Sequence, residues 1–184
     1  MKSKQLFNKV IKKVLKSEGG YTNDPADNGN WTGGKQGKGR LIGTNYGISA
    51  PILEKWKGSD AMASDMKGLD IEVAKNIYWN YFWTKCHSDK LPLEVQYIHY
   101  DASINHGLTG ANKILQRVLD VGVDGIVGKI TLGKANKATL EAYAIERMCE
   151  YGRIISARPA NAKYAKGWTQ RVKDVYNYTK NELI

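Results

Sequence analysis

The sequence is poor in cysteine and histidine and has no long hydrophobic run. Cys86 and Cys149 are too few for a disulfide framework, so we expect reduced thiols, with a bridge between them left open. No uninterrupted apolar stretch has the length that spans a bilayer, which argues against stable membrane insertion. His99 and His106 could share a helix face, but no third ligand accompanies them. We therefore expect neither a metal nor a cofactor.

Acidic residues are also scarce relative to basic ones. The 184 residues contain 18 acidic and 28 basic side chains, which gives a formal net charge of +10. This excess predicts a polyanionic partner, and nucleic acid, an anionic membrane surface and the bacterial cell wall all qualify; solubility alone is the alternative. No nucleic-acid-binding motif is recognisable, so we expect no nucleic-acid partner.

The chain also lacks internal repeats, disordered linkers and the apolar segment of a signal peptide. Residues 1–5 are basic, but polar residues interrupt the helix that follows. We expect a monomer with one globular domain over residues 1–184, made in the cytoplasm without a signal peptide.

A carboxylate at a helix end is the most unusual local feature. Apolar residues recur at helical spacing from Leu6 to Leu15, and the glycines at 19–20 predict the end of that helix. Glu18 is then the last helical residue or close to it, on the apolar side. The helix macrodipole and partial burial both favour its protonated form. An acid in a place that suits a lysine indicates a functional site.

A second carboxylate follows in a turn, at Asp27. Glycoside hydrolysis requires a carboxyl that stays protonated near neutral pH and a second carboxylate across the scissile bond. Glu18 and Asp27 could supply this pair. The alternative is a solvated helix end and an ordinary turn residue, because residues 24–29 are typical turn chemistry.

Three segments carry a family resemblance. Residues 18–21 (Glu-Gly-Gly-Tyr), 23–29 (Asn-Asp-Pro-Ala-Asp-x-Gly) and 44–48 (Thr-Asn-Tyr-Gly-Ile) resemble glycoside hydrolase family 108, whose members are N-acetylmuramidases, typically phage endolysins, with a lysozyme-like fold. The resemblance implies that Glu18 is the catalytic acid and that Asp27 is the second carboxylate. It also places the motif residues Tyr21 and Tyr46 at the substrate.

An insertion at residues 33–43 departs from the family pattern. Without a gap Thr32 takes the third catalytic position, whereas by local motif Thr44 does, and the sequence leaves both open. The insertion is rich in glycine and basic residues, so we expect either a small β-hairpin or flap at about 28–46 that contacts substrate, or a surface loop.

The second half of the chain resembles a peptidoglycan-binding region. Asp101 and Asn105 lie in a predicted helix over 95–105 and resemble a family segment near the cleft, although Asp101 could equally be a hydrogen-bonded core acid. Residues 123–131 (Val-Asp-Gly-x-x-Gly-x-x-Thr) resemble peptidoglycan-binding modules and could be a ligand contact or a structural turn.

We expect a mainly α, lysozyme-like fold whose halves, 1–90 and 91–184, carry the catalytic motifs and the peptidoglycan-binding-like region. Further helices are predicted over 70–86, 111–119, 132–156 and 164–182. The aromatic cluster at 78–83 is expected to be mostly core, and the inward residues of 132–156 are expected to be Leu140, Tyr143, Ala144, Ile145, Met148 and Tyr151.

The expected activity is that of an N-acetylmuramidase that cuts the β-1,4 bond between N-acetylmuramic acid and N-acetylglucosamine, acts on the cell wall after release, and lyses bacteria. Two alternatives remain: a lytic transglycosylase that uses Glu18 alone, and a non-catalytic wall-binding or lysis-accessory protein on the same fold.

Overall fold

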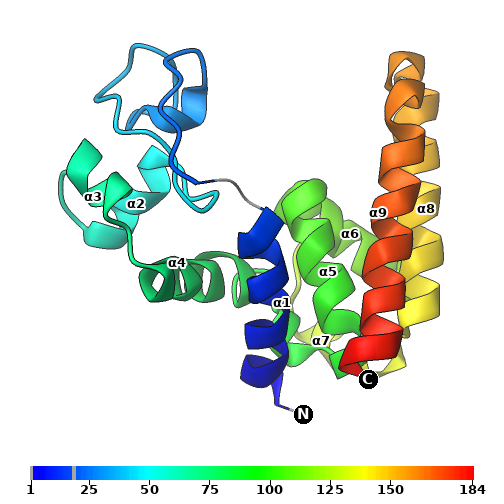
Figure 1. Ribbon diagram of the computed structural model, residues 1–184. Helices are drawn as coiled ribbons and strands as arrows, with labels where there is room; N and C mark the ends of the chain where they lie inside the picture. The colour runs from blue at the N-terminus through cyan, green and yellow to red at the C-terminus, as the bar shows by residue number, and fades with distance from the viewer. Residues whose placement is uncertain (1, 18–19) are drawn as a thin grey trace. The chain divides into compact units, whose positions relative to one another are not determined.

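The computed structural model describes residues 2–17 and 20–184 and is mainly helical, which confirms the predicted fold class (Figure 1). The predicted helix end at Glu18 lies outside the described residues. The α-helices are α1 (Ser3–Ser17), α2 (Ala50–Lys57), α3 (Ala63–Lys67), α4 (Ile71–Tyr78), α5 (Leu93–Asn105), α6 (Gly107–Val118), α7 (Lys129–Gly133), α8 (Leu140–Ala157) and α9 (Ala165–Tyr178). No described helix combines the length and the apolar character needed to cross a membrane.

The chain divides into two compact units. One consists of residues 1–8 and 80–184, and the other of residues 9–79. The division falls within α1 and just after α4, so the unit boundary differs from the predicted halves. The single globular domain over 1–184 stays a prediction.

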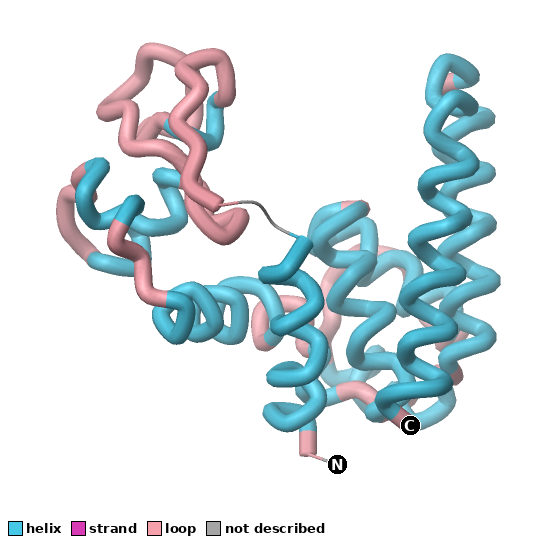
Figure 2. Tube along the Cα trace, viewed as in Figure 1, coloured by secondary structure: helices cyan, strands magenta, loops and turns pink. Residues whose placement is uncertain are grey.

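The unit of residues 9–79 contains the second part of α1, then a long loop and short helices (Figure 2). Apart from a 3₁₀ turn at Asn28–Asn30, residues 20–49 are loop, with isolated antiparallel bridges in place of strands in this described stretch. Ser49 precedes α2, Pro51 lies in its first turn, and Gly58 ends it with a left-handed conformation. The conformation of this loop is therefore held by isolated pairing between its two sides and not by a sheet.

The unit of residues 1–8 and 80–184 is built around α5. Its residues from Val95 to Ala102 are all buried, because α6, α8 and α9 contact it. The core continues through an aromatic cluster in which the Trp83 ring lies 5.3 Å from Phe7 and 5.0 Å from Tyr100. Of the five aromatic residues at 78–83, Tyr78 and Trp83 are buried and the other three are partly exposed, so the prediction of a mostly core cluster holds for two of the five. Both cysteines are free, with Cys86 buried and Cys149 exposed, which confirms the predicted thiols.

The predicted helix over 70–86 is wrong in its second half. The α-helix begins after Asp70, whose side chain accepts hydrogen bonds from the backbone N–H groups of Glu72 and Val73, and it ends at Tyr78. A π-helical turn follows from Trp79 to Trp83. The wider turn shifts the register of the side chains after Tyr78, so the 3.6-residue periodicity does not extend to Cys86. Ile71, the first residue of α4, is 42% exposed.

The predicted helix over 132–156 is also wrong at its start. α7 ends at Gly133, and α8 begins only at Leu140, where the Thr139 hydroxyl accepts a hydrogen bond from the Ala142 N–H. Leu140, Tyr143 and Tyr151 are buried as predicted, but Ile145 is 66% exposed and Met148 is 36% exposed. The buried position between them belongs to Arg147, which a purely apolar pattern does not reveal.

Candidate functional site

Asp27 lies in a turn that its own carboxylate helps to build. Its Oδ1 accepts a hydrogen bond of 2.8 Å from the Gly29 N–H, and it thereby caps the 3₁₀ turn at Asn28–Asn30. Asn30 is fully buried and donates through Nδ2 to the Asp24 carbonyl at 2.9 Å. The buried Asn30 side chain thus holds the turn in place, while Asp27 is exposed.

Thr44 borders the same space as Asp27. The backbones of Thr22 and Thr44 pair through hydrogen bonds of 2.9 and 2.8 Å, which bring Thr44 beside the turn. A β-carbon added at Gly29 would lie 3.3 Å from Asp27 Oδ1 and 3.8 Å from Thr44 Oγ1. Gly29 therefore lies next to both the carboxylate and the hydroxyl, and sequence reasoning did not single it out.

Thr32 has a different place in the structure. Its hydroxyl accepts a hydrogen bond of 3.0 Å from the Arg40 N–H, and its own N–H donates to the Arg40 carbonyl at 2.9 Å. These bonds lie next to the Trp31–Leu41 bridge and close the insertion loop at its base. The geometry therefore favours Thr44 over Thr32 as the partner of Asp27, and the catalytic role of either stays a prediction.

The insertion loop is tied down at two points. The backbone N–H of Gln36 donates to Asn28 Oδ1 at 2.8 Å, so the middle of the loop is attached to the turn that carries Asp27. Arg40 pairs with Glu54 at 2.5 Å and with Asp60 at 2.8 Å. The hydrogen bonds that Arg40 donates to the carboxylates of Asp60 and Glu54 raise the pKa of Arg40 above its usual value. The loop is therefore an anchored flap, with one attachment at the candidate site.

Tyr21 and Tyr46, the predicted substrate contacts, belong to the same unit as Asp27. The Tyr21 hydroxyl is buried and has no hydrogen-bond partner in the described part of the chain. Tyr46 has a left-handed backbone with φ of 51°, and its carbonyl accepts a hydrogen bond of 3.0 Å from the Tyr78 hydroxyl. This contact fixes the backbone of the motif, and substrate binding by either tyrosine stays a prediction.

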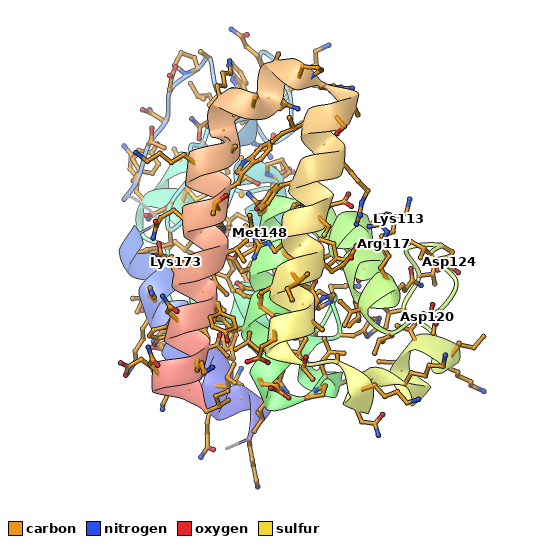
Figure 3. All side chains as sticks on the ribbon, turned by 90° about the vertical axis from the view of Figure 1, so that its right-hand side faces the viewer. Lys113, Arg117, Asp120, Asp124, Met148 and Lys173 are labelled. Carbon is orange, nitrogen blue, oxygen red and sulfur yellow. The ribbon has the colours of Figure 1, made fainter. Side chains whose placement is uncertain are left out.

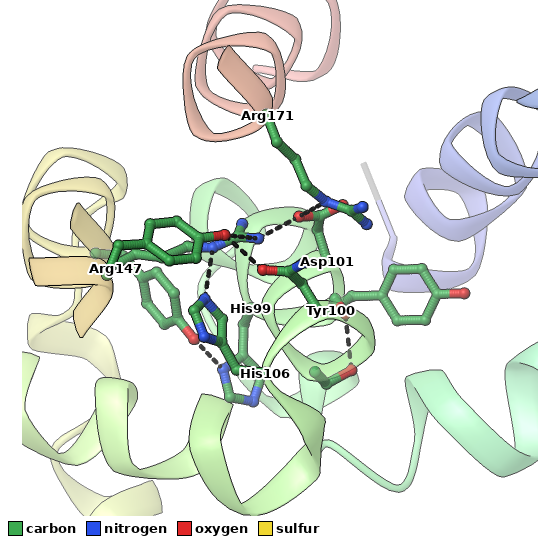
Figure 4. Close-up of polar contacts among 10 residues, drawn as sticks. His99, Tyr100, Asp101, His106, Arg147 and Arg171 are labelled. Carbon is green, nitrogen blue, oxygen red and sulfur yellow. Dashed lines mark hydrogen bonds and ion pairs between the residues drawn. The ribbon is translucent and has the colours of Figure 1, made fainter. Parts of the chain in front are cut away.

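Asp101 lies in the other unit, between two arginines (Figure 4). Arg147 of α8 donates to Oδ2 at 2.6 Å, and Arg171 of α9 donates to both carboxylate oxygens at 2.8 to 3.1 Å. The hydrogen bonds with Asp101 raise the pKa of Arg171, whereas burial acts in the opposite direction. The carboxylate joins three helices, and this geometry favours the alternative of a structural acid.

Asn105 is part of the same polar cluster. Its side-chain oxygen accepts a hydrogen bond from the Tyr151 hydroxyl, and the Tyr151 ring stacks on Trp168 with centroids 4.7 Å apart. Arg147 was missed in the sequence, although its spacing of four from the buried Tyr143 and Tyr151 places it on the inner face of α8. Arg171 stands in a Gly-Trp-x-x-Arg element that resembles the family's terminal segment.

The two histidines considered as ligands form hydrogen bonds within the protein, His106 by accepting from the Arg147 Nε–H at 3.4 Å. His99 is fully buried, with Nδ1 2.8 Å from the Tyr143 hydroxyl and Nε2 2.8 Å from the Cys86 carbonyl. Since a carbonyl only accepts, Nε2 carries the proton and Nδ1 accepts from the tyrosine. Burial lowers the pKa of His99 to about 4. Within residues 2–17 and 20–184 no group of three His, Cys, Asp or Glu side chains could hold a metal ion.

Known proteins resemble this chain over most of its length. Residues 11–107 match the family model described as Glycosyl hydrolase 108, and residues 110–173 match a model described as Predicted Peptidoglycan domain. The solved structure of SagA from Brucella abortus is 29% identical, with a TM-score of 0.70 over 97% of this chain and 95% of that one. No curated protein matches.

The first model covers the turn of Asp27, the Thr44 pairing and the insertion loop, and the second covers both arginines that hold Asp101. The pair of models indicates a glycoside hydrolase that acts on peptidoglycan. On these matches, the chain belongs to the glycosyl hydrolase 108 family.

Proposed function

We propose that the protein is an N-acetylmuramidase that cleaves the β-1,4 bond between N-acetylmuramic acid and N-acetylglucosamine in peptidoglycan. Glu18 protonates the leaving oxygen, and Asp27 with Thr44 orients the attacking water or stabilises positive charge on the sugar. The observation that carries the proposal is that Asp27 Oδ1 and Thr44 Oγ1 both lie close to Gly29, 3.3 and 3.8 Å from where its β-carbon would be. A carboxylate and a hydroxyl are thus close together at this turn.

The turn leaves Asp27 suited to this role. One oxygen is held by the Gly29 N–H, and among the described residues no hydrogen bond engages the other oxygen. A carboxylate fixed at one oxygen has a defined orientation, which general-base catalysis requires. Direct attack by water would invert the anomeric configuration and requires carboxyl groups about 6.5 to 9.5 Å apart, whereas about 5 Å would indicate a covalent intermediate.

The proposed pair is tested by three variants assayed for release of soluble fragments from purified peptidoglycan. Asp27→Asn should lower kcat by about 10²-fold or more, as expected for the loss of a base. Thr44→Val should lower kcat about tenfold, the value of one hydrogen bond in the transition state.

Thr32→Val is the matched control, because it also removes a threonine hydroxyl from the same loop. It should leave kcat within about twofold and reduce stability by about 1 kcal/mol, since it opens the base of the flap. Equal kcat losses in Thr32→Val and Thr44→Val would refute the assignment of Thr44.

The biological setting follows from the substrate. A muramidase made in a bacterial cytoplasm would reach the wall only after release, and its activity would lyse the cell. The anchored insertion beside Asp27 supports one second candidate, a non-catalytic wall-binding protein. Wild-type protein that sediments with peptidoglycan without cutting it would favour that candidate, and an anhydro-sugar product would indicate a lytic transglycosylase instead.

A further inference from the structure

The turn after α6 is rigidly built. The buried Gln116 donates to Asp124 Oδ1 at 2.7 Å and to the Ile126 carbonyl at 3.1 Å, and it accepts from the Gly125 N–H at 2.7 Å. Asn112 adds a bond of 2.9 Å to the Gly125 carbonyl. These bonds show that the Val-Asp-Gly motif has a structural role, since two side chains of α6 hold its backbone.

The rigid turn displays apolar side chains to solvent. Ile126 is 71% exposed and Ile130, in the first turn of α7, is 75% exposed. They line a pocket of about 360 Å³ together with Val121, Thr131, Lys129 and the buried Gln116. A volume of this size fits a small ligand, and apolar walls with a few fixed polar groups are typical of binding sites. Gln116 accepts from the Gly125 N–H and donates to the Ile126 carbonyl, so the backbone that carries Ile126 is fixed.

The rim of the pocket carries charges of both signs. Asp124 and Lys129 line it, and both are exposed. Figure 3 shows Asp124 and Asp120 on the loop beside α6, with Lys113 and Arg117 on α6 itself. Hydrogen bonds from the Gln116 amide and the Ile126 N–H lower the pKa of Asp124, so it is ionised at neutral pH. The pocket thus offers an anionic and a cationic contact beside aliphatic walls.

The lining argues against a sugar ring as the ligand. Sugar-binding sites stack apolar sugar faces on aromatic rings, and the residues that line this pocket include no aromatic side chain. The peptide stem of peptidoglycan has the matching chemistry, because it combines alanine methyl groups with carboxylates and, where it contains a diamino acid, an ammonium group. The methyl groups would contact Ile126 and Ile130, a carboxylate would pair with Lys129, and the ammonium would pair with Asp124.

We propose that this pocket binds the peptide stem of peptidoglycan. This role is distinct from that of the carboxylates that act on the glycan. The inference rests on the proposed function for its choice of ligand, and on the pocket for its location. It would give the region matched as a peptidoglycan domain a defined contact surface. An enzyme with this pocket would prefer peptide-bearing strands to bare glycan.

The test is a titration of the full chain with the tetrapeptide L-alanyl-γ-D-glutamyl-meso-diaminopimelyl-D-alanine, followed by calorimetry and by amide NMR shifts. Wild-type protein should bind with shifts confined to residues 116–131. Ile130→Ser should bind about fivefold more weakly, because it removes an apolar contact without touching the core. Lys129→Ala should also weaken binding.

Ile145→Ser is the matched control, since Ile145 is an exposed isoleucine of the same unit, 66% exposed on α8. It should bind as the wild type does. The proposal is overturned if the tetrapeptide does not bind at millimolar concentration, if Ile130→Ser binds as tightly as the wild type, or if chitotetraose displaces the peptide from these residues.

The outcome separates the inference from the proposed activity. If the protein cuts peptidoglycan but does not bind the tetrapeptide, the binding proposal for the pocket is refuted and the proposed activity is not. A protein that binds the tetrapeptide through Ile130 but never cuts peptidoglycan would refute the muramidase and leave the pocket as a wall-binding site.

Discussion

Among the predicted substrate contacts, Asp101 is the one for which the structure most clearly favours a structural role. Both of its oxygens are engaged by arginines, and the Arg147 side chain is fully buried. Replacing Asp101 by asparagine would leave that cation without its counter-charge, and breaking a buried pair typically costs about 3–5 kcal/mol. We predict that Asp101→Asn loses stability of this order in urea unfolding, while the KM of the remaining folded protein stays near the wild-type value.

Asp174→Asn is the control for that measurement. Asp174 is an exposed acid on α9 that accepts a hydrogen bond from Gln170, and its loss should change stability by less than about 0.5 kcal/mol. An Asp101→Asn protein with normal stability and a raised KM would instead support substrate binding by Asp101.

The burial of His99 predicts that the stability of the protein depends on pH. Its pKa is about 4 in the folded protein because of burial, and about 6.5 when unfolded. Between these values the unfolded chain binds the proton and the folded chain does not, so stability falls as pH decreases from about 6.5 toward 4. The loss attributable to His99 is about 3 kcal/mol.

Urea unfolding at pH 7 and at pH 4.5 checks this. In His99→Gln the side chain can still donate to the Cys86 carbonyl and accept from Tyr143, but it does not titrate. The variant should therefore lose distinctly less stability at pH 4.5 than the wild type. Identical losses in both proteins would show that His99 does not contribute.

Among the elements, the loop over residues 20–49 depends on two glycines in different ways. Gly43 and Gly37 both have positive φ, 89° and 74°. A β-carbon at Gly43 would lie 2.5 Å from the Thr22 carbonyl oxygen and 2.6 Å from the Tyr21 ring, whereas one at Gly37 would meet nothing within 4 Å. Gly43 thus allows the close pairing that places Thr44, and Gly37 meets only a conformational requirement.

Substituting alanine at each position separates the two effects. Gly37→Ala should cost about 1 kcal/mol from the strained backbone alone. Gly43→Ala should cost a further ~1–3 kcal/mol from overpacking and should reduce lysis of peptidoglycan. Thermal unfolding and fragment release measure both, and equal effects of the two substitutions would contradict the described pairing.

The elements also indicate how far sequence reasoning extends. The helix predicted over 95–105 ends at Asn105, as α5 does, because the signals that end a helix are local. Arg147 in the core, and Ile145 on the surface, could not be predicted from apolar periodicity, since the partner that makes burial of an arginine possible lies on another helix. In the site, the Glu-Gly-Gly-Tyr motif indicated Glu18, but the choice between Thr32 and Thr44 required the backbone pairing across the insertion.

For the whole molecule, the excess of positive charge is the dominant physical property. The net charge of +10 should attract the protein to an anionic wall, and salt screens that attraction over about 10 Å at 0.1 M. We predict that kcat/KM on peptidoglycan falls several-fold between low and high salt. Salt-independent cleavage of peptidoglycan would contradict electrostatic steering.

The most direct test of the account is mass spectrometry of the products formed from purified peptidoglycan by the wild-type protein and by Glu18→Gln. The account predicts reducible muropeptides that end in N-acetylmuramic acid, formed by the wild type and lost in the variant. Anhydro products, or no cleavage by either protein, would contradict the proposed muramidase.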